Sequence, residues 1–383
     1  MSGYRRYYAG IDIGAIESNV EAVLEKIPDN VKIMAVVKAD AYGHGACTVA
    51  EYLEDRVDWF GVADIDEAIE LRRSGIKKPV LILGFVDPED YKASVENNIA
   101  LAMFSLKDAE KLSAVAMELN KTANVHIKLD TGMSRIGYQP TPESADQVEQ
   151  INNLPYINVE GLFSHFATAD EKDLTDALLQ RTRYDTFVQM LETRGVHIGL
   201  KHLDNSAGTM AMDKYYDMVR IGIIMYGLYP SSEIDKCIKL MPAMELISHI
   251  SMVKQISPGT GVSYGRTYVA DKPVKVATVP VGYADGYPRS LSNKGEVLIN
   301  GRRCRVIGRV CMDQMMVDVT GVECQEGDKV VLVGRSGDEY ISVEEVAEVA
   351  DTFNYEFICR VGRRVPRRYF KNGKCIKEIT YLG

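Results

Sequence analysis

The chain has 383 residues, of which 46% are hydrophobic and 26% are charged, as is usual for a globular protein with a large core. Its formal net charge of −9 argues against a basic surface that would bind nucleic acid or anionic membranes. No apolar run approaches the ~18 residues that span a bilayer, and the first residues, MSGYRRYYAGIDIG, lack the apolar core of a signal peptide.

Seven cysteines are scattered along the chain, and no two of them form a C-x-x-C pair. Neither a disulfide framework nor a zinc site follows from this spacing. The simplest interpretation is free thiols in a reducing cytoplasm.

Up to about residue 230, short apolar runs alternate with longer amphipathic stretches. Eight runs have the composition of strands: residues 33–37, 60–63, 80–84, 100–104, 125–129, 159–163, 201–204 and 219–223. Between them, helices are expected at residues 65–76 and 106–120, the second with Ser105 as its N-cap and Asp108 three residues on. Such alternation indicates a buried parallel sheet, and eight units predict a (β/α)8 barrel, with an open doubly wound sheet as the runner-up.

Beyond about residue 235 the pattern changes to strand-like runs separated by turns. Asn300-Gly301 and Asn372-Gly373 are dipeptides that favour hairpin turns. One short helix is expected over residues 343–353. We therefore predict an α/β fold with a barrel over residues 11–235 and a mostly β domain over residues 236–383.

A basic segment, CRVGRRVPRRY at residues 359–369, stands out near the end of the chain. Its arginines are Arg360, Arg363, Arg364, Arg367 and Arg368. The simpler interpretation is a strand or sheet edge with solvated arginines, and the alternative is a phosphate-binding patch.

Residues that follow the early barrel strands are candidates for chemistry, because barrel active sites lie at the carboxyl ends of the strands. Lys38 continues an apolar strand, where burial lowers an amine pKa and favours imine formation with an aldehyde. A lysine that reaches solvent or forms an ion pair is the structural alternative. Tyr42 follows in a glycine-containing turn. Lys128, Asp130 and Arg135 follow the fifth strand, where a surface salt bridge is the simpler alternative.

The later strands carry polar residues at the same end. His165 follows the sixth strand, although a lone histidine beside apolar residues is more often a core residue. Asn205 and Ser206 follow the seventh strand and could bind a phosphate, or merely cap a helix.

The eighth strand carries Arg220, whose guanidinium needs acceptors from the protein or from a ligand if it is buried. Gly222 and Ile223 then offer backbone amides. An imine-forming lysine, a phosphate cradle and an inward arginine together suit pyridoxal phosphate (PLP) in a barrel mouth.

At this point the sequence resembles the bacterial alanine racemases, a family of fold-type III PLP enzymes. The resemblance covers nearly the whole chain through ordered motifs: AVVKADAYGHG, IKLDTGMSRIG, SHFATAD, LDNSAG, VRIGIIMYGLYPS, GVSYGRTY, VPVGYADGYPR, GRVCMDQMMVD, NYE and RVPRRY. The first of these and GVSYGRTY are the most specific. One departure is FICRVG after NYE, where the family usually has Pro-Cys-Leu.

The resemblance implies how the cofactor is bound. Lys38 would hold PLP through an imine, and Arg220 would face its pyridine nitrogen. The residues implied to bind the phosphate are Tyr42, Ser206, Gly222, Ile223 and Tyr355.

The resemblance also implies a substrate site. Arg135 and the Met312 backbone would receive the substrate carboxylate, while Tyr283 and Asp313 would line the approach. Lys128 would be the lysine that is often carbamylated in this family and that positions Arg135.

The family forms homodimers, in which Tyr264, Tyr283 and Met312 would reach the barrel of the other subunit. Its first short strand, here about residues 4–10 and counted within residues 1–10, would join the C-terminal domain.

Racemisation of alanine needs two bases on opposite faces of the reacting carbon, with PLP stabilising the charge between them. Lys38 would serve one face and Tyr264 the other. A free tyrosine titrates near pH ~10, so Tyr264 needs positive charge nearby. His165 linked to Arg220 is the family's arrangement for that purpose. The implied function is interconversion of L- and D-alanine, which supplies D-alanine for cell-wall synthesis.

Other functions compete with this interpretation. GVSYG at residues 261–265 fits the G-x-S-x-G elbow of a serine hydrolase, but all six histidines precede Ser263 and the following residues read as a strand. A non-catalytic PLP-carrier barrel would lack the second domain and Tyr264. A PLP decarboxylase would place a carboxylate where this chain has Arg220. Preference for serine, or broader specificity, stays open within the racemases.

Overall fold

The computed structural model describes residues 6–382, and the chain divides into two compact units. One unit, here called the barrel unit, comprises residues 15–41 and 46–242. The other, the β unit, comprises residues 1–14, 42–45 and 243–383. Residues 1–5, which belong to the predicted N-terminal segment 1–10, and residue 383 lie outside the described residues.

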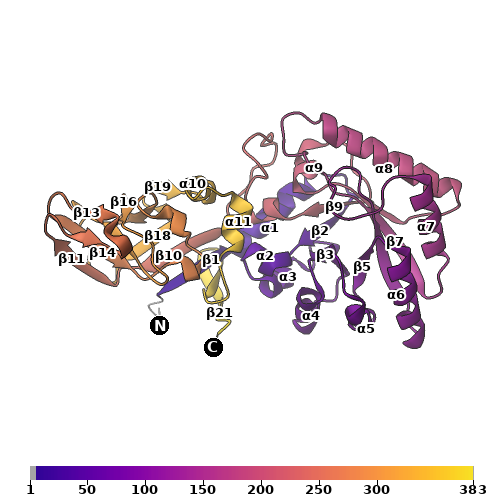
Figure 1. The fold of residues 1–383 in the computed structure, drawn as a ribbon, viewed down its shortest axis with the longest axis horizontal. Coiled ribbons are helices and arrows are strands. Elements are labelled where there is room, and N and C mark those ends of the chain that lie inside the picture. The colour runs from indigo at the N-terminus through magenta and orange to yellow at the C-terminus, as the bar shows by residue number, and fades with distance from the viewer. Residues whose placement is uncertain (1–5, 383) are drawn as a thin grey trace. The chain divides into compact units, whose positions relative to one another are not determined.

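The barrel unit contains eight parallel strands in the order β8-β7-β6-β5-β4-β3-β2-β9 (Figure 1). Their bounds are β2 Lys32–Val36, β3 Trp59–Val62, β4 Val80–Ile82, β5 Ala100–Met103, β6 Ala123–Lys128, β7 Ile157–Phe163, β8 Leu200–His202 and β9 Met218–Ile221. Backbone hydrogen bonds of 2.9 Å from Asp217 N to Lys201 O and from Arg220 N to Asp204 O bring the last two segments together. The sheet is therefore nearly closed, and the predicted barrel is confirmed over the open sheet.

Helices alternate with these strands and lie on their outer side (Figure 1). They are α1 Ile13–Leu24, α3 Ala46–Leu53, α4 Ile65–Arg73, α5 Tyr91–Glu96, α6 Leu106–Glu118, α7 Pro142–Asn152, α8 Thr175–Thr193 and α9 Ser206–Ala211, with short 3-10 turns η1 Pro88–Asp90 and η2 Ile223–Tyr226. Ser105 accepts a hydrogen bond from Asp108 N and caps α6, as predicted. Among the described residues, no helix combines the length and apolar character needed to cross a membrane.

The β unit is built on a mixed sheet in the order β11-β14-β17-β16-β15-β18-β10-β1-β20-β21, with β19 paired to β18. The bounds are β1 Tyr7–Asp12, β10 Met244–His249, β11 Met252–Ile256, β14 Val274–Val279, β15 Glu296–Ile299, β16 Arg302–Ile307, β17 Met315–Asp318, β18 Lys329–Ser336, β19 Glu339–Ile341, β20 Arg367–Lys371 and β21 Lys374–Ile379. A two-stranded ribbon, β12 Gly261–Val262 with β13 Tyr268–Val269, and helices α10 Val343–Val349 and α11 Asn354–Cys359 accompany it. Strand β1 pairs with β10 and β20, so residues 7–12 lie inside this sheet.

Both predicted hairpin turns are confirmed. Asn300-Gly301 joins β15 to β16 with φ angles of 48° and 73°, and Asn372-Gly373 joins β20 to β21 with φ angles of 52° and 71°. Positive φ at both central residues is the geometry that Asn-Gly tolerates best.

The basic segment near residue 367 forms a strand, but its arginines are not all solvated. Arg367 is completely buried, and it donates to the carbonyl oxygens of Gly43, Val361 and Gly362 at 2.9, 2.6 and 2.7 Å. A buried guanidinium is stable only when such acceptors surround it. The prediction of solvated arginines is therefore wrong at this position, where the arginine holds backbone segments together.

Candidate active site

Lys38 lies two residues beyond the end of β2 and begins a turn of unusual handedness. Ala39, Asp40, Ala41 and Tyr42 have φ angles of 52° to 53°, which makes one turn of left-handed helix. This conformation costs L residues about 1–2 kcal/mol each. Residues 39–42 therefore form a strained segment, which the glycine-containing turn expected from the sequence did not indicate.

Two carboxylates hold this turn in place. The two oxygens of Glu67, on α4, accept from Ala39 N at 2.6 Å and from Ala63 N at 2.8 Å. Asp40 accepts from Ala46 N at 2.9 Å. Burial raises the pKa of Glu67, against the hydrogen bonds that favour its charged form. Glu67 thus ties the lysine turn to the next strand, a role that its place on an amphipathic helix did not reveal.

Arg220, on β9, is buried among acceptors. Its Nη1 donates to Nδ1 and to the carbonyl oxygen of His202, both at 3.0 Å. Its Nη2 donates to the carbonyl oxygens of Ser164 at 2.7 Å and Leu203 at 2.9 Å. Among the described residues, nothing accepts from the fifth N–H, on Nε. That single proton is left to meet a ligand.

His165 lies against the same guanidinium, with its Nδ1 3.3 Å from Nη2 of Arg220. Because arginine can only donate, Nδ1 faces it as an acceptor, while Nε2 lies 3.4 Å from the side-chain amide nitrogen of Asn205, a second donor. Burial, and next the charge of Arg220, hold the pKa of His165 well below its usual value. Lys38 and Lys128 add to this effect. His165 is therefore a neutral imidazole held between two donors, Arg220 and Asn205.

Lys128, at the end of β6, is only 2% exposed. Its Nζ donates to Leu129 O at 2.7 Å and lies 5.4 Å from the centre of the Phe163 ring. Burial, followed by the charge of Arg220, lowers the pKa of Lys128 to about 7. Lys128 forms no ion pair with the described residues, so a surface salt bridge at this position is ruled out.

Asp130 shapes the loop that carries Arg135. One of its oxygens accepts from Gly132 N and Ser134 N, both at 3.0 Å. Arg135 is exposed, and within residues 6–382 its side chain has no hydrogen-bond or ion-pair partner. Its guanidinium is thus available to an anionic ligand.

Ser206 and Gly222 come together behind η2. Ser206, the first residue of α9, accepts from Gly222 N at 2.9 Å, and Ile223 opens the 3-10 turn directly after. Asn205 caps α9 by accepting from Gly208 N at 2.9 Å, so the capping interpretation holds for that residue. A hydroxyl and adjacent amides are the donors that bind phosphate.

In the β unit, Tyr42 and Tyr355 lie close together. Their ring centroids are 6.2 Å apart, and Phe353 lies 5.8 Å from Tyr355 on the other side. Two tyrosines that the sequence places 313 positions apart thus form one aromatic cluster.

The GVSYG segment is not a nucleophile elbow. Its first two residues form β12, which pairs with β13, and Tyr264 opens the 3-10 turn η3, Tyr264–Arg266, between the two strands. Ser263 donates its hydroxyl proton to Arg309 O at 2.6 Å, so it is not poised for attack. Tyr264 is 71% exposed on this unit.

Tyr283 and Met312 lie on two adjacent loops. Tyr283 N donates to Cys311 O and Ala284 N donates to Met312 O, both at 3.0 Å. A Cβ at Gly282 would lie 2.3 Å from both carbonyl oxygens. Only glycine permits this close pairing.

Arg364 holds these loops from behind. It contacts Asp313 at 2.6 Å and the buried Asp285 at 3.0 Å. Asp285 also contacts Arg6 at 2.5 Å and accepts from Gly282 N at 3.0 Å. Asp313 is thus paired with an arginine of the basic segment, a function that the sequence did not assign to that segment.

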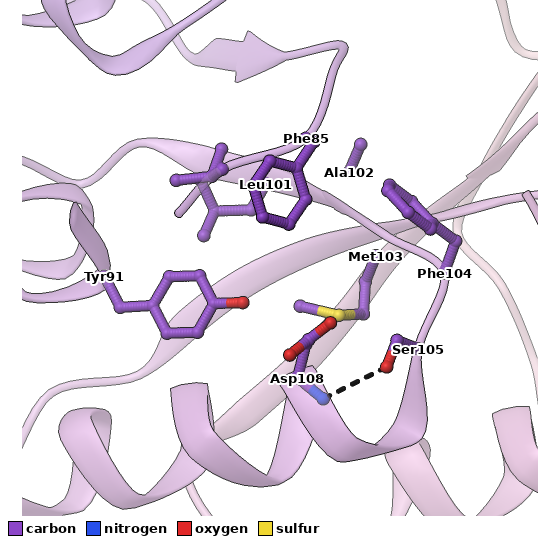
Figure 2. Close-up of a pocket in the computed structure, with 9 residues that line it drawn as sticks. Phe85, Tyr91, Leu101, Ala102, Met103, Phe104, Ser105 and Asp108 are labelled. Atoms are coloured by element: carbon purple, nitrogen blue, oxygen red, sulfur yellow. Dashed lines mark hydrogen bonds between the residues drawn. The ribbon is translucent and has the colours of Figure 1, made fainter. Parts of the chain in front are cut away.

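A separate pocket lies beyond β4 and β5. Figure 2 shows its apolar lining, with Phe85, Leu101, Met103 and Tyr91 around the space and the Ser105–Asp108 cap at its edge. The residues that line it include none of the predicted site residues.

Comparison with known proteins agrees with this geometry. Residues 11–230 match the alanine racemase N-terminal domain family, and residues 243–369 match the C-terminal domain family. Alanine racemase of Clostridium perfringens is 44% identical over 382 residues, which cover 99% of both chains. Alanine racemase of Desulforamulus reducens is 45% identical, covering 94% of this chain and 98% of the relative.

Solved structures show the same fold. Alanine racemase of Clostridium difficile 630 superposes with a TM-score of 0.95 at 41% identity, covering 98% of this chain and 99% of the other. Alanine racemase from Bacillus anthracis with bound L-Ala-P superposes with a TM-score of 0.95 at 40% identity, covering 100% and 99%. By fold, by both domains and by sequence, the chain belongs to the alanine racemase family.

Proposed function

We propose that this protein interconverts L- and D-alanine with PLP as its cofactor. The observation that carries the proposal is the set of hydrogen bonds that Arg220 donates. Four of its N–H groups are bound by the protein and the Nε–H is left over. This is what an unprotonated pyridine nitrogen requires, because a guanidinium donates one hydrogen bond and keeps its charge.

The other cofactor contacts follow from the same barrel face. Lys38 would bind the aldehyde, and Ser206, Gly222 and Ile223 would bind the phosphate. The Gly222 N–H would have to exchange its present acceptor, Ser206 Oγ, for a phosphate oxygen. Tyr42 and Tyr355 would add phenols to the phosphate site. When bound, PLP stabilises the negative charge that develops on the substrate Cα.

Two residues would move the proton. Lys38 Nζ takes or returns the Cα proton on one face, and Tyr264 Oη does so on the other. The positive charge of Arg220, which lies behind His165, would lower the pKa of the tyrosine that approaches this histidine.

Substrate binding would rely on charge. Arg135 has a free guanidinium for the alanine carboxylate, and the Met312 amide would add a donor. Lys128 has the lowered pKa that reaction with carbon dioxide requires, and its carbamate would then fix Arg135.

Tyr283 and Asp313 would line the approach to the site. A pocket beside Tyr283 supports this proposal, and it is lined also by Gly286, Pro288, Arg289 and Arg360.

We further propose a homodimer in which the β unit of one subunit completes the barrel site of the other. The large side chains of Tyr264, Tyr283 and Met312 are 71%, 43% and 52% exposed. Exposed side chains of this size are typical of surfaces that contact another molecule. The corresponding domain division is residues 11–235 and residues 236–383 with 1–10. The proposed location is the cytoplasm and the proposed role is to supply D-alanine for peptidoglycan.

The two bases can be tested separately by following α-proton exchange from each enantiomer in deuterated water. We expect Lys38→Ala to abolish exchange from both enantiomers, because it also removes the cofactor anchor. We expect Tyr264→Phe to slow abstraction from one enantiomer by about 10²-fold or more while the other still exchanges. Full rates in both directions for Tyr264→Phe would exclude it as a base.

Substrate identity needs its own measurement. Purified protein should bind PLP and racemise alanine faster than serine at equal concentration. A PLP-loaded protein that racemises neither would overturn the proposal in favour of a non-catalytic carrier.

A further inference from the structure

Behind Arg220, on the side away from the free Nε–H, a line of polar side chains crosses the interior of the barrel. Nη1 of Arg220 lies 3.0 Å from Nδ1 of His202, and Nε2 of His202 lies 2.9 Å from Nδ1 of His126. Nε2 of His126 then lies 3.7 Å from a carboxylate oxygen of Glu160. Both histidines are completely buried.

The two ends of this line fix the position of every proton in it. Arg220 can only donate, so His202 must present a lone pair on Nδ1 and carry its proton on Nε2. That proton is donated to Nδ1 of His126, which leaves the proton of His126 on Nε2. A carboxylate can only accept, and the negative charge of Glu160, 3.7 Å from Nε2, favours the same arrangement by electrostatic attraction. The opposite tautomers would set donor against donor at Arg220 and acceptor against acceptor at Glu160.

The backbone is built to bring Glu160 to this place. The pairing of β6 with β7 shifts register between Val125 and His126, so that Val159 and Gly161 are paired and Glu160 between them is the extra residue. Such bulges redirect a side chain. A Cβ at residue 161 would lie 2.3 Å from Nδ1 of His126, so only Gly161 admits the imidazole.

Burial leaves the last pair no other partner. Nε2 of His126 and the facing oxygen of Glu160 are both shielded from solvent and have no hydrogen-bond partner among the described residues. The rings around them are apolar: Phe163 stacks on His202 at 5.0 Å, and Trp59 meets His126 edge-on at 5.0 Å. Neutral imidazoles suit this environment, because burial lowers the pKa of both histidines.

Arg220 itself has no carboxylate within ion-pair distance among residues 6–382, although burial of a lone guanidinium is costly. Asp204 acts on it only at longer range. The two histidines therefore transmit the negative charge of Glu160 towards Arg220, in addition to that of Asp204. The carboxylate of Glu160 itself stays outside the ligand site.

We propose that Glu160 and His126 are positioning residues that lock the tautomer of His202, and so fix Arg220 with its Nε–H directed to the ligand site. The effect on the cofactor rests on the proposed function, whereas the tautomers do not. In the intact protein, replacement of the carboxylate at residue 160 by an apolar group would free both imidazoles to exchange tautomers. Arg220 would then lose the steady acceptor on Nδ1 of His202 and keep its backbone acceptors.

The tautomers can be measured without any activity, by ¹⁵N NMR of histidine-labelled full-length protein free of cofactor. We expect both His202 and His126 to carry their proton on Nε2, assigned by loss of each signal in His202→Gln and His126→Gln. In Glu160→Leu we expect mixed tautomers for both rings. Glu160→Gln, which retains an accepting oxygen without the charge, should largely restore the single tautomer.

A wild-type His202 that is doubly protonated or protonated on Nδ1 would overturn the proposal, as would unchanged tautomers in Glu160→Leu. If Glu160→Leu does not fold, the wild-type and Glu160→Gln spectra still decide the question. Failure of the proposed function would show separately, as no racemisation by a wild-type protein with the expected tautomers.

The reaction provides a second readout. We expect Glu160→Leu to lower kcat about tenfold with little change in KM, as is usual when the group that orients an active residue is removed. It should also shift the absorbance of the bound cofactor. The matched control is Glu118→Leu on the exposed face of α6, which should alter neither. Equal kcat and spectra for the two variants would overturn the positioning role.

Discussion

At the scale of single residues, Arg220 and Lys128 share one buried environment but differ in charge at neutral pH. Arg220 and Lys128 lie 5.6 and 5.4 Å from the centre of the same Phe163 ring, and burial lowers the pKa of both. Arg220, with a pKa of about 10, keeps its proton at neutral pH. Lys128, with a pKa of about 7, is deprotonated in a substantial fraction of the molecules at that pH. The arginine is thus a fixed charge and the lysine a reactive amine.

The lowered pKa of Lys128 makes the stability of the protein depend on pH. Between pH 7 and the ordinary lysine pKa of ~10.4, the unfolded chain binds a proton that the folded chain does not. The contribution of Lys128 to the free energy of unfolding therefore rises with pH across this range, by at most about 1.4 kcal/mol per unit. Below pH 7 its penalty is constant.

Urea unfolding of wild type and Lys128→Met at pH 7, 8 and 9, in buffer free of carbon dioxide, measures this dependence. As pH rises, we expect the free energy of unfolding of wild type to increase relative to that of Lys128→Met. Substitution of the exposed Lys107 by Met should give a difference that is independent of pH. Parallel pH curves for wild type and Lys128→Met would contradict the shifted pKa.

At the scale of elements, the left-handed turn after β2 is held by tertiary contacts against its own preference. Ala39 is exposed, so a change there affects the backbone more than the packing. Glycine has no Cβ to clash in this conformation, although it costs about 0.5–1 kcal/mol of chain entropy.

We predict that Ala39→Gly stabilises the protein by about 0.5–1 kcal/mol, since relief of about 1–2 kcal/mol of strain exceeds the entropy cost. The exposed Ala114, in the right-handed α6, is the matched control. Ala114→Gly should destabilise by about 1 kcal/mol. Thermal melts of the two variants should therefore move in opposite directions, and a shift of the same sign would contradict the strain.

The paired loops of Tyr283 and Met312 depend on a clamp outside the site. Removing Arg364 would release Asp313 and leave Asp285 with Arg6 as its remaining ion-pair partner among the described residues. We predict that Arg364→Met raises KM for alanine about tenfold, or ~1.4 kcal/mol, with a smaller effect on kcat. Steady-state kinetics check this, with Arg302→Met on an exposed strand position as control. A KM equal to that of the control would show that the clamp does not position the loops.

Sequence patterns predicted the elements better than the contacts between them. The eight barrel strands and the two Asn-Gly hairpins follow from local composition, and all are present. Strand β11 carries no comparable signal, because its side chains are largely exposed and show no apolar alternation. Glu67, His202 and Asp285 were missed for another reason: each acts through a partner distant in the sequence, which only the tertiary structure brings near.

At the scale of the whole molecule, the proposed active site needs two chains. Lys38→Ala and Tyr264→Phe would each be inactive as homodimers, but in a mixed dimer one site keeps Lys38 of one chain and Tyr264 of the other. Random reassortment of equal amounts makes half of the dimers mixed, and each has one intact site. We therefore predict recovery of about one quarter of wild-type activity after the two variants are dissociated and mixed.

The double variant mixed with an equal amount of wild type is the control for reassortment. Exchange should lower its activity from about one half to about one quarter of the wild-type value, because no site of a mixed dimer keeps both Lys38 and Tyr264. Activity that stays at the level of the unmixed variants, while exchange is demonstrated, would mean that each site is built by a single chain.

The left-handed turn also fixes when the active site can form during folding. Four residues that each cost about 1–2 kcal/mol in this conformation will hardly visit it in an isolated segment. The groups that hold it, Ala63 with Glu67 on one side and Ala46 on the other, belong to the next strand and helices. These must be in place first, so we expect the turn to be among the last parts of the barrel to fold and the first to open. A newly made chain would then have the rest of its barrel before Lys38 is in position.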